Sequence, residues 1–270
     1  MISVIVPTHN RRAALERKLR ALEGQPGSFE VIVVADGCTD DTQQFLAEYH
    51  PPYSLRVLET GRGDGRGVAF ARNRGAEAAR GDLLLFSDDD VVPQPGWIQA
   101  HQNAHSGASV VAVGRLLLPP DLRNSGAAEL RGPRVFWWNI TGNNTSLPKP
   151  LFEKVGGYDE AFSAYGGEDP DLGYRLGRAG ARIQFVAAAE AVHEAYDHQK
   201  GALARAKAAG EAHVRVWKKY GDPKIAWALG VHPVLLGVKM ATLPWLRTLI
   251  GPRADRELAY SWGAWNQRSA

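Results

Sequence analysis

Three consecutive carboxylates, Asp88, Asp89 and Asp90, are the side chains of this sequence best suited to chemistry. They come one residue after an uninterrupted apolar run, Leu83 to Phe86. Such a run is typical of a strand buried on both faces of a parallel sheet, and the acids then lie at its carboxyl end, where open α/β sheets bind ligands. Carboxylates this close repel one another unless a cation or hydrogen-bond donors compensate, and Mg²⁺ or Mn²⁺ suits one or two carboxylates plus substrate phosphates. A solvated acidic turn is the alternative interpretation.

A second acidic pair, Glu168 and Asp169, stands in a glycine-rich turn. The turn comes just before an expected helix with Pro170 at its first position, a place that proline favours. Carboxylates there can simply cap the helix. Their use in a site therefore depends on what the rest of the chain indicates.

Strands and helices are expected to alternate around these acids. Short apolar runs predict buried strands and periodic apolar residues predict helices. Strands are expected at 2–6, 29–34, 54–58 and 83–86, with helices at 11–23, 40–49 and 68–79 between them. This order predicts an α/β fold with a parallel, doubly wound sheet. Farther along, helices are expected at 97–105, 150–155 and 201–220, and strands at 108–113, 181–186 and 191–193.

Three stretches between these elements are candidates for ligand contact. Residues 61–67 hold four glycines and two arginines, which predicts either a loop that approaches phosphate or a flexible linker. Residues 115–133 form a long aperiodic segment, which favours a lid over the site. Adjacent Trp137 and Trp138 would place one ring on each face of a strand, as a sugar platform or as two core residues.

Composition narrows the class of protein. The chain has 270 residues, 44% hydrophobic, with a net charge of +3 and a pI near 9.0, which is ordinary for a globular protein. Its basic residues are not concentrated in a recognisable motif, which disfavours nucleic-acid binding. Cys38 is the only cysteine, so no internal disulfide is possible and a reducing compartment is expected. The N-terminus lacks the pattern of a signal peptide, and we therefore expect a cytoplasmic protein.

The C-terminal region carries an apolar run over residues 224–250 that prolines and charged residues interrupt. The run approaches the length of a membrane span, but Pro233, Pro244 and Lys239 argue against a simple crossing. Peripheral contact with the cytoplasmic face of a membrane is one interpretation. A helical appendage packed on the core, or on a second subunit in a homodimer, is the other.

Six motifs occur in an order that resembles the family 2 glycosyltransferases of the GT-A fold. They are Val4-Ile-Val-Pro-Thr-His-Asn10, Val33-Val-Ala-Asp36, Ala71-Arg-Asn-Arg-Gly75, the acidic triplet, Gly156-Gly-Tyr-Asp159 and Gly167-Glu-Asp169. The resemblance covers roughly residues 1 to 200 and implies a single, mainly parallel, Rossmann-like sheet with flanking helices. It implies a nucleotide-binding half at 1–100 and an acceptor-binding half at 101–200. Residues 201–270 match no motif and are expected to form a helical extension.

The resemblance also implies an activity and a donor site. It implies inverting transfer of a sugar from a nucleotide-sugar, with a UDP-sugar favoured, to a hydroxyl of a glycan, a lipid-linked sugar or a small molecule. The implied cofactor is a divalent cation, Mn²⁺ or Mg²⁺. Pro7 and Thr8 would border the nucleoside, Asp36 would accept a hydrogen bond from the base, and Arg72 would approach the base or the diphosphate.

In the same resemblance the acidic triplet corresponds to the DXD motif of the family. Asp88 would reach the ribose, Asp90 would bind the metal, and Asp89 would do either. With His193, which matches a further metal ligand in some members, the implied metal set is Asp88, Asp90 and His193; a structural histidine is the alternative. Asp169 matches the catalytic base, and Glu168 would orient that base or bind the acceptor.

The chemistry explains why such groups would be needed. A nucleoside diphosphate gains negative charge as it leaves, and a cation on its phosphates stabilises that charge. The acceptor hydroxyl attacks from the opposite face, where a carboxylate must take its proton. Three other classes stay open: a retaining transferase, a sugar nucleotidyltransferase, and a non-catalytic sugar- or nucleotide-binding module. The Glu168-Asp169 turn favours inversion, and the intact acids disfavour a degenerate enzyme.

Overall fold

The computed structural model describes residues 1–105, 109–119, 135–163, 165–194 and 201–269. The chain divides into two compact units, Met1–Ser163 with Leu172–Tyr196, and Ala164–Asp171 with Asp197–Ala270. Each unit is described by itself.

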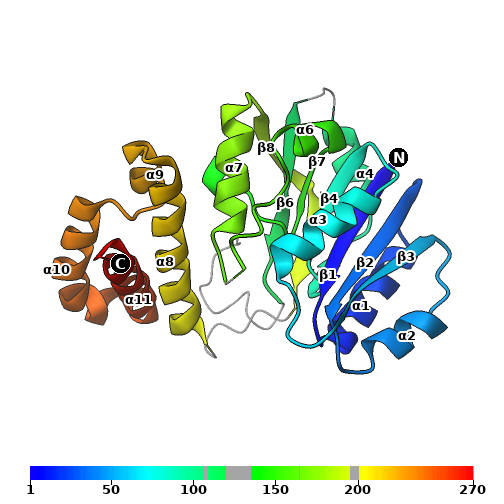
Figure 1. Ribbon diagram of the computed structural model, residues 1–270, viewed down its shortest axis with the longest axis horizontal. Coiled ribbons are helices and arrows are strands. Elements are labelled where there is room, and N and C mark those ends of the chain that lie inside the picture. Colours follow the sequence, from blue (N-terminus) through cyan, green and yellow to red (C-terminus); the bar gives the residue numbers. More distant parts are fainter. Residues whose placement is uncertain (106–108, 120–134, 164, 195–200, 270) are drawn as a thin grey trace. The chain divides into compact units, whose positions relative to one another are not determined.

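The first unit is built around one sheet with helices on both faces (Figure 1). Its elements, together with α7, which begins in the second unit, are β1 (Ile2–Thr8), α1 (Arg12–Glu23), β2 (Phe29–Gly37), α2 (Thr42–Glu48), β3 (Ser54–Arg62), α3 (Val68–Ala78), β4 (Leu83–Phe86), β5 (Val91–Pro93), α4 (Trp97–Ala104), β6 (Val110–Leu117), the 3₁₀ helix η1 (Trp137–Asn139), β7 (Thr145–Pro148), α6 (Lys149–Lys154), α7 (Glu168–Arg178) and β8 (Arg182–His193).

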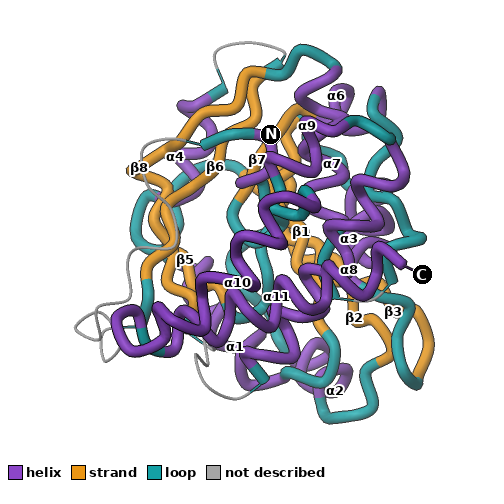
Figure 2. Tube along the Cα trace, turned by 90° about the vertical axis from the view of Figure 1, so that its left-hand side faces the viewer, coloured by secondary structure: helices purple, strands orange, loops and turns teal. Residues whose placement is uncertain are grey.

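The sheet has eight strands in the order β3-β2-β1-β4-β7-β6-β8-β5. The first four strands in this order are parallel, as are β6 and β8. Antiparallel pairs join β7 to β4 and to β6, and β5 to β8. The expected α/β architecture with a mainly parallel sheet is therefore confirmed, and the second half of the sheet is mixed. Figure 2 shows the parallel strands β1, β2 and β3 side by side.

Two apolar clusters, one on each face of the sheet, fix its position between the helices. Successive side chains of a strand point to opposite faces of the sheet, so Val4 and Val6 of β1 lie in one cluster and Ile5 lies in the other. The first cluster includes Leu15, Leu19 and other residues of α1. The second receives side chains of α3, α6 and α7. Burial on both faces explains why these strands read as continuous apolar runs in the sequence.

Several local expectations were wrong. The segments expected at 181–186 and 191–193 belong to one continuous strand, β8. Strand β6 pairs with both parts of β8, and the register of this pairing shifts between Gly114 and Arg115. The tryptophan pair lies in the 3₁₀ helix η1, so its rings do not take the two faces of a strand; they contact edge to face instead. Helix α7 begins at Glu168, two residues before Pro170. Of the expected lid, Arg115 to Leu117 belong to β6, and residues 120–133 lie outside the described residues.

The second unit consists mainly of helices α8 (Ala202–Tyr220), α9 (Pro223–Ala228), α10 (Pro233–Ile250) and α11 (Pro252–Ser269). Helix α11 packs against both α8 and α10 (Figure 1). Gly210 of α8 and Gly263 of α11 allow the close crossing, since a Cβ on either would lie 2.1 Å from a carbonyl oxygen of the other helix. The first turn of α7 belongs to this unit.

Candidate functional site

The acidic triplet forms the turn between β4 and β5. Strand β1 runs parallel to β4, and the backbone N–H of Ser87 donates to the carbonyl of Ile5, so the turn begins at the carboxyl edge of both strands. The N–H of Val91 donates to the carbonyl of Asp88 at 3.2 Å and closes the turn. This is the sheet edge at which open α/β folds bind ligands.

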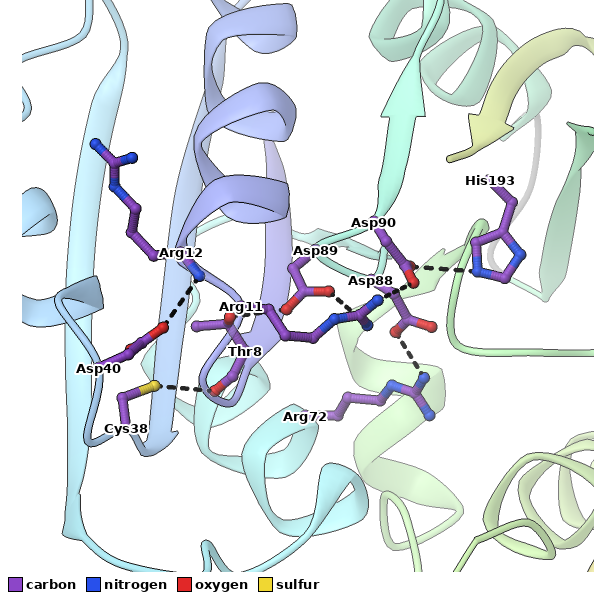
Figure 3. Close-up of polar contacts among 10 residues, drawn as sticks. All are labelled: Thr8, Arg11, Arg12, Cys38, Asp40, Arg72, Asp88, Asp89, Asp90 and His193. Carbon is purple, nitrogen blue, oxygen red and sulfur yellow. Dashed lines mark hydrogen bonds and ion pairs between the residues drawn. The ribbon is translucent and has the colours of Figure 1, made fainter. Parts of the chain in front are cut away.

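Arg11 holds two of the three acids. Its Nη1 lies 3.0 Å from Oδ1 of Asp89, and its Nη2 donates to Oδ2 of Asp90 at 2.7 Å (Figure 3). The hydroxyl of Thr8, at the end of β1, donates to Oδ2 of Asp89 at 2.7 Å. Burial opposes the charge of the Arg11 guanidinium, but Asp89 and Asp90 outweigh burial and raise its pKa. Arg11 is thus the donor that allows adjacent carboxylates to share one turn.

The two buried acids differ in charge state. Burial raises the pKa of Asp89 to about 7, and the attraction of Arg11 compensates only in part. Burial also disfavours the charged form of Asp90, but the His193 imidazole and the Arg11 guanidinium prevail and lower its pKa to about 2. Asp90 is therefore the firmly ionised member of the pair at neutral pH.

Asp88 has its own cationic partner. Nη2 of the buried Arg72 donates to Oδ1 of Asp88 at 2.9 Å, and the guanidinium lies 5.2 Å from the ring centroid of Tyr158. Gly142 leaves room for this group, since a Cβ there would lie 2.1 Å from Cζ of Arg72. The family resemblance implies that Arg72 approaches the base or the diphosphate; in the structure its guanidinium is bound to Asp88.

His193 lies beside Asp90 because of strand register. Strand β5 pairs antiparallel with β8 so that Val91 stands opposite His193, and Nε2 of His193 lies 3.3 Å from Oδ1 of Asp90. Oδ1 is buried and accepts no hydrogen bond from the described residues. Two ligands of an octahedral ion, each about 2.1 Å from it, lie about 3 Å apart, so this oxygen and nitrogen fit two positions of a divalent cation.

The full metal set is not assembled. Among the described residues, no three or more His, Cys, Asp or Glu side chains are grouped to hold a metal ion. The implied set of Asp88, Asp90 and His193 therefore stays a prediction. Two protein ligands still fit Mg²⁺ or Mn²⁺, because such ions often take their remaining ligands from water and substrate phosphates.

Asp36 anchors the glycine-rich loop. Its Oδ2 accepts hydrogen bonds from the backbone N–H groups of Arg66 and Gly67, both at 2.8 Å, and Oδ1 accepts from the hydroxyl of Thr60 at 2.6 Å. The guanidinium of Arg66 lies 3.6 Å from the ring centroid of Phe70. The carboxylate expected to meet a base thus holds the loop that follows β3, at the same sheet edge as Thr8.

Glu168 and Asp169 form the start of α7 in the second unit, where Glu168 is buried and Asp169 is partly exposed. Asp171, one turn into the helix, is fully buried and its Oδ1 accepts from Nζ of Lys219 at 2.6 Å and from the hydroxyl of Tyr220 at 2.7 Å. The C-terminus of α8 therefore holds the turn that carries the acidic pair.

Two residues that hold the acidic turn, Arg11 and Lys18, are not predicted from the sequence as part of the site. The sequence predicts only that both belong to the helix expected at 11–23. Lys18 gave a signal, since it falls on the apolar face formed by Ala14, Leu15, Leu19 and Leu22, where a lysine is out of place. Arg11 gave none, because its partners are 79 residues away for Asp90 and nearly as far for Asp89.

Comparison with known proteins settles the family. The model for "Glycosyl transferase family 2" matches residues 3–165. The chain belongs to glycosyl transferase family 2. Membership confirms the resemblance carried by the six motifs. A curated family relative, validoxylamine A glucosyltransferase of Streptomyces hygroscopicus subsp. limoneus, is 34% identical over 220 residues, covering 65% of this chain and 48% of that protein. The chain therefore spans about half the length of such relatives.

Solved structures show the same fold for this family 2 chain. A mannosyltransferase of Pyrobaculum calidifontis, solved with GDP-Man and Mn²⁺, has a TM-score of 0.70 at 21% identity, covering 99% of this chain and 86% of that one. TarS of S. aureus, solved with UDP-GlcNAc, has a TM-score of 0.60 at 17% identity, covering 99% and 91%.

Proposed function

We propose that this protein is a metal-dependent, inverting glycosyltransferase that moves a sugar from a nucleoside-diphosphate sugar to an acceptor hydroxyl. A UDP-sugar is the favoured donor, and a glycan, a lipid-linked sugar or a small molecule is the acceptor. The proposed catalytic domain is 1–200, with a nucleotide-binding half at 1–100 and an acceptor-binding half at 101–200. A cytoplasmic location agrees with a single cysteine, Cys38, that is free and buried.

The observation that carries the proposal is the state of Asp90. This carboxylate stays ionised, one of its oxygens is held by Arg11, and the other lies 3.3 Å from His193 without a hydrogen bond from the described residues. Such an arrangement suits a divalent cation shared with a diphosphate. The neighbours solved with GDP-Man and Mn²⁺ and with UDP-GlcNAc support a nucleotide-sugar donor.

Each residue then has a role in the proposed reaction. Asp90 and His193 would hold the cation, with Asp88 the third member of the expected set. A cation bound there neutralises charge on the leaving diphosphate. Arg11 and Thr8 keep Asp89 and Asp90 in place, and Arg72 does the same for Asp88. Pro7, Thr8, Asp36 and Asp89 would border the nucleoside and ribose.

Asp169 would take the proton of the acceptor hydroxyl, with Glu168 orienting it or binding the acceptor. Asp169 is partly exposed, as a base that meets an entering acceptor must be. Inversion follows if this single carboxylate serves the attacking hydroxyl and no covalent sugar intermediate forms.

The test is a thermal-shift panel of UDP, GDP, dTDP and CDP, each with and without Mn²⁺. A ligand that binds the folded state raises the unfolding midpoint by mass action, by about 2.7 kcal/mol of stability at one hundred times its dissociation constant. We expect one nucleotide to raise the midpoint only with Mn²⁺. The corresponding nucleotide-sugar is then supplied with an acceptor, and its turnover is measured through the release of the nucleoside diphosphate.

Asp90→Asn should abolish the Mn²⁺-dependent shift, because the amide removes the charge that the cation needs. Asp82→Asn is the matched control, since Asp82 precedes the other end of β4 and its side chain is 97% exposed. Asp169→Asn should keep the shift and lose turnover. Absence of any nucleotide shift with Mn²⁺ would contradict the proposal, and a shift without turnover in the unaltered protein would favour a binding module.

A further inference from the structure

Helix α10 has two apolar faces. Leu236 and Leu243, seven residues apart, are buried against the rest of the second unit. On the opposite side, Val234, Val238, Trp245 and Leu249 are exposed by 62, 54, 83 and 79%. Their spacing of four, seven and four residues aligns them along one side of the helix. These four residues are called the outer stripe.

The charged side chains of α10 do not lie on the outer stripe. Nζ of Lys239 lies 3.0 Å from Glu257, and Nε of Arg247 lies 2.9 Å from Asp255, so both basic residues are paired with acids of α11. The pairing holds them on the side of the helix that faces α11. The face that bears the outer stripe therefore carries no charged side chain over four turns, and its one hydroxyl, that of Thr242, donates to the carbonyl of Val238. Such a face is unusual for a helix open to water.

The composition of the region identifies what would cover the stripe. Residues 223–270 contain four of the eight tryptophans of the chain, Trp227, Trp245, Trp262 and Trp265, and all four are exposed by 39% or more. The same segment has six Lys and Arg against two Asp and Glu. Tryptophan prefers the boundary between water and lipid, and basic residues near it attract anionic headgroups. A second copy of this segment would instead bring two positively charged surfaces together.

The helices favour lying on a bilayer over crossing it. Within the described residues one stretch, Pro223–Ile250, is long and apolar enough to span a membrane by length and composition. The stretch is broken into α9 and α10 by residues 229–232, and Pro244 lies inside α10. One face of α10 is also occupied by α11. A helix with one packed face and one apolar face can enter the headgroup region without leaving its fold.

We propose that the outer stripe of α10 docks the protein on an anionic membrane surface, with Trp245 and Leu249 entering the boundary between headgroups and acyl chains. This proposal does not rest on the transferase reaction. Binding to the membrane would hold the protein beside lipid-linked acceptors, which are one of the acceptor classes named above.

The test is flotation of the full-length protein with vesicles of phosphatidylcholine alone and of phosphatidylcholine with phosphatidylglycerol, at 0.1 M NaCl. We expect binding to the anionic vesicles and much weaker binding to the neutral ones. The double variant Trp245→Ser with Leu249→Ser should bind at least about tenfold more weakly, since two apolar side chains no longer leave water. Leu203→Ser is the matched control, because Leu203 is 51% exposed on α8, outside the stripe, and it should bind as the unaltered protein does.

Four results would overturn the proposal. Three concern vesicles: no binding of the unaltered protein to anionic vesicles, equal binding to neutral vesicles, and undiminished binding by the double variant. The fourth, described below, concerns the association state. Thermal unfolding midpoints of all variants establish that they are folded, and sedimentation without vesicles measures their association state. A dimer that the double variant loses would assign the stripe to a second copy. Because the nucleotide shift with Mn²⁺ is measured on the same variants, failure of membrane docking is distinguishable from failure of the transferase.

Discussion

Lys18 lies fully buried beneath the acidic turn. Its Nζ donates to the hydroxyl of Ser87 and, at 2.7 Å, to the carbonyl of Val91, the two residues that flank the triplet. The ammonium also lies 4.7 Å from the ring centroid of Trp97. Burial lowers the pKa of Lys18 to about 7 against the attraction of the three acids. One side chain of α1 thus holds both ends of the turn.

Lys18→Met should loosen the acidic turn. Methionine has similar length but no donor, so the hydroxyl of Ser87 and the carbonyl of Val91 lose a partner, at a cost of about 1–3 kcal/mol in the free energy of unfolding. We expect a weaker Mn²⁺-dependent nucleotide shift as well. Lys149→Met is the control, because Lys149 also donates to a backbone carbonyl, that of Ala79, in the same unit. It should lower stability without changing the metal-dependent shift, and equal effects of both variants would refute a positioning role for Lys18.

His213 makes the second unit sensitive to acid. The hydroxyl of Tyr260 donates to the carbonyl of Leu229 at 2.5 Å, so it must accept its other bond, of 2.7 Å, from Nδ1–H of His213. Burial lowers the pKa of His213 to about 4. The unfolded chain, with a pKa near 6.5, therefore binds more protons between pH 4 and pH 6.5, and stability falls as the pH is lowered through that range.

The loss should be about 2 kcal/mol between pH 7 and pH 5 for this one group. Denaturant unfolding at the two values measures it. His213→Asn keeps a donor at the position of Nδ1 but cannot titrate. The free energy of unfolding of this variant should therefore change by about 2 kcal/mol less between pH 7 and pH 5 than that of the unaltered protein. An unchanged difference between pH 7 and pH 5 in the variant would place the acid sensitivity elsewhere, for instance at His105, whose pKa burial also lowers to about 4.

At the scale of elements, α7 carries the proposed base, and α8 holds its first turn. Asp171→Asn weakens the acceptor shared by Lys219 and Tyr220, so the turn bearing Glu168 and Asp169 should lose its fixed position. If the transferase proposal is correct, turnover of the donor sugar should fall at least about tenfold, because misplacement of a base by 1 Å is costly, while the nucleotide shift with Mn²⁺ stays unchanged.

Asp222→Ala provides the control for Asp171→Asn. Asp222 caps α9 by accepting from the N–H of Lys224 at 2.9 Å, so loss of this acceptor should lower the stability of the same unit by about 1 kcal/mol. It should leave turnover per folded molecule unaltered. Equal loss of turnover in both variants would mean that general stability, and not the position of the base, sets the rate.

The elements that the sequence predicted well are those specified locally. Strands β1, β2 and β4 are apolar runs buried on both faces, and α1 is periodic, so neighbours in the chain determine them. Strand β8 is specified by its partners: the sequence pattern of residues 187–190 does not predict a strand, but β8 pairs with β6 as far as Val192 and with β5 at His193. The 3₁₀ helix at Trp137 likewise departs from the period that its aromatic residues suggest.

In the candidate site, too, the sequence predicts what is specified locally and misses what depends on distant partners. The positions of Thr8 and the acids at a sheet edge follow from strand order, so the sequence could place them. The pairing of Arg11 with Asp89 and Asp90, and of Lys18 with Ser87 and Val91, joins α1 and the residue that precedes it to residues 69 to 79 positions away. Such contacts depend on how α1 packs across the sheet, and no local pattern specifies them.

At the scale of the whole molecule, charge is unevenly divided. Residues 1–163 and 172–196 contain twenty Lys and Arg and twenty-one Asp and Glu, whereas residues 164–171 and 197–270 contain twelve and eight. All of the net positive charge of the chain therefore belongs to the second unit, which also carries the outer stripe. An anionic surface is expected to attract this unit in preference to the first.

Salt should then weaken vesicle binding. Raising NaCl from 0.1 to 1 M shortens the Debye length from about 10 Å to about 3 Å, which screens charges near the surface but spares apolar contacts.

Lys224→Gln with Arg253→Gln removes two exposed charges of the second unit, worth about 1 kcal/mol each near an anionic membrane, so affinity at 0.1 M NaCl should fall at least about tenfold. Arg74→Gln with Arg80→Gln removes two exposed charges of the first unit and should leave binding unchanged. Equal effects of the two double variants would show that net charge alone attracts the protein to the vesicle. A loss confined to the second unit would show that the basic helices and the outer stripe act together.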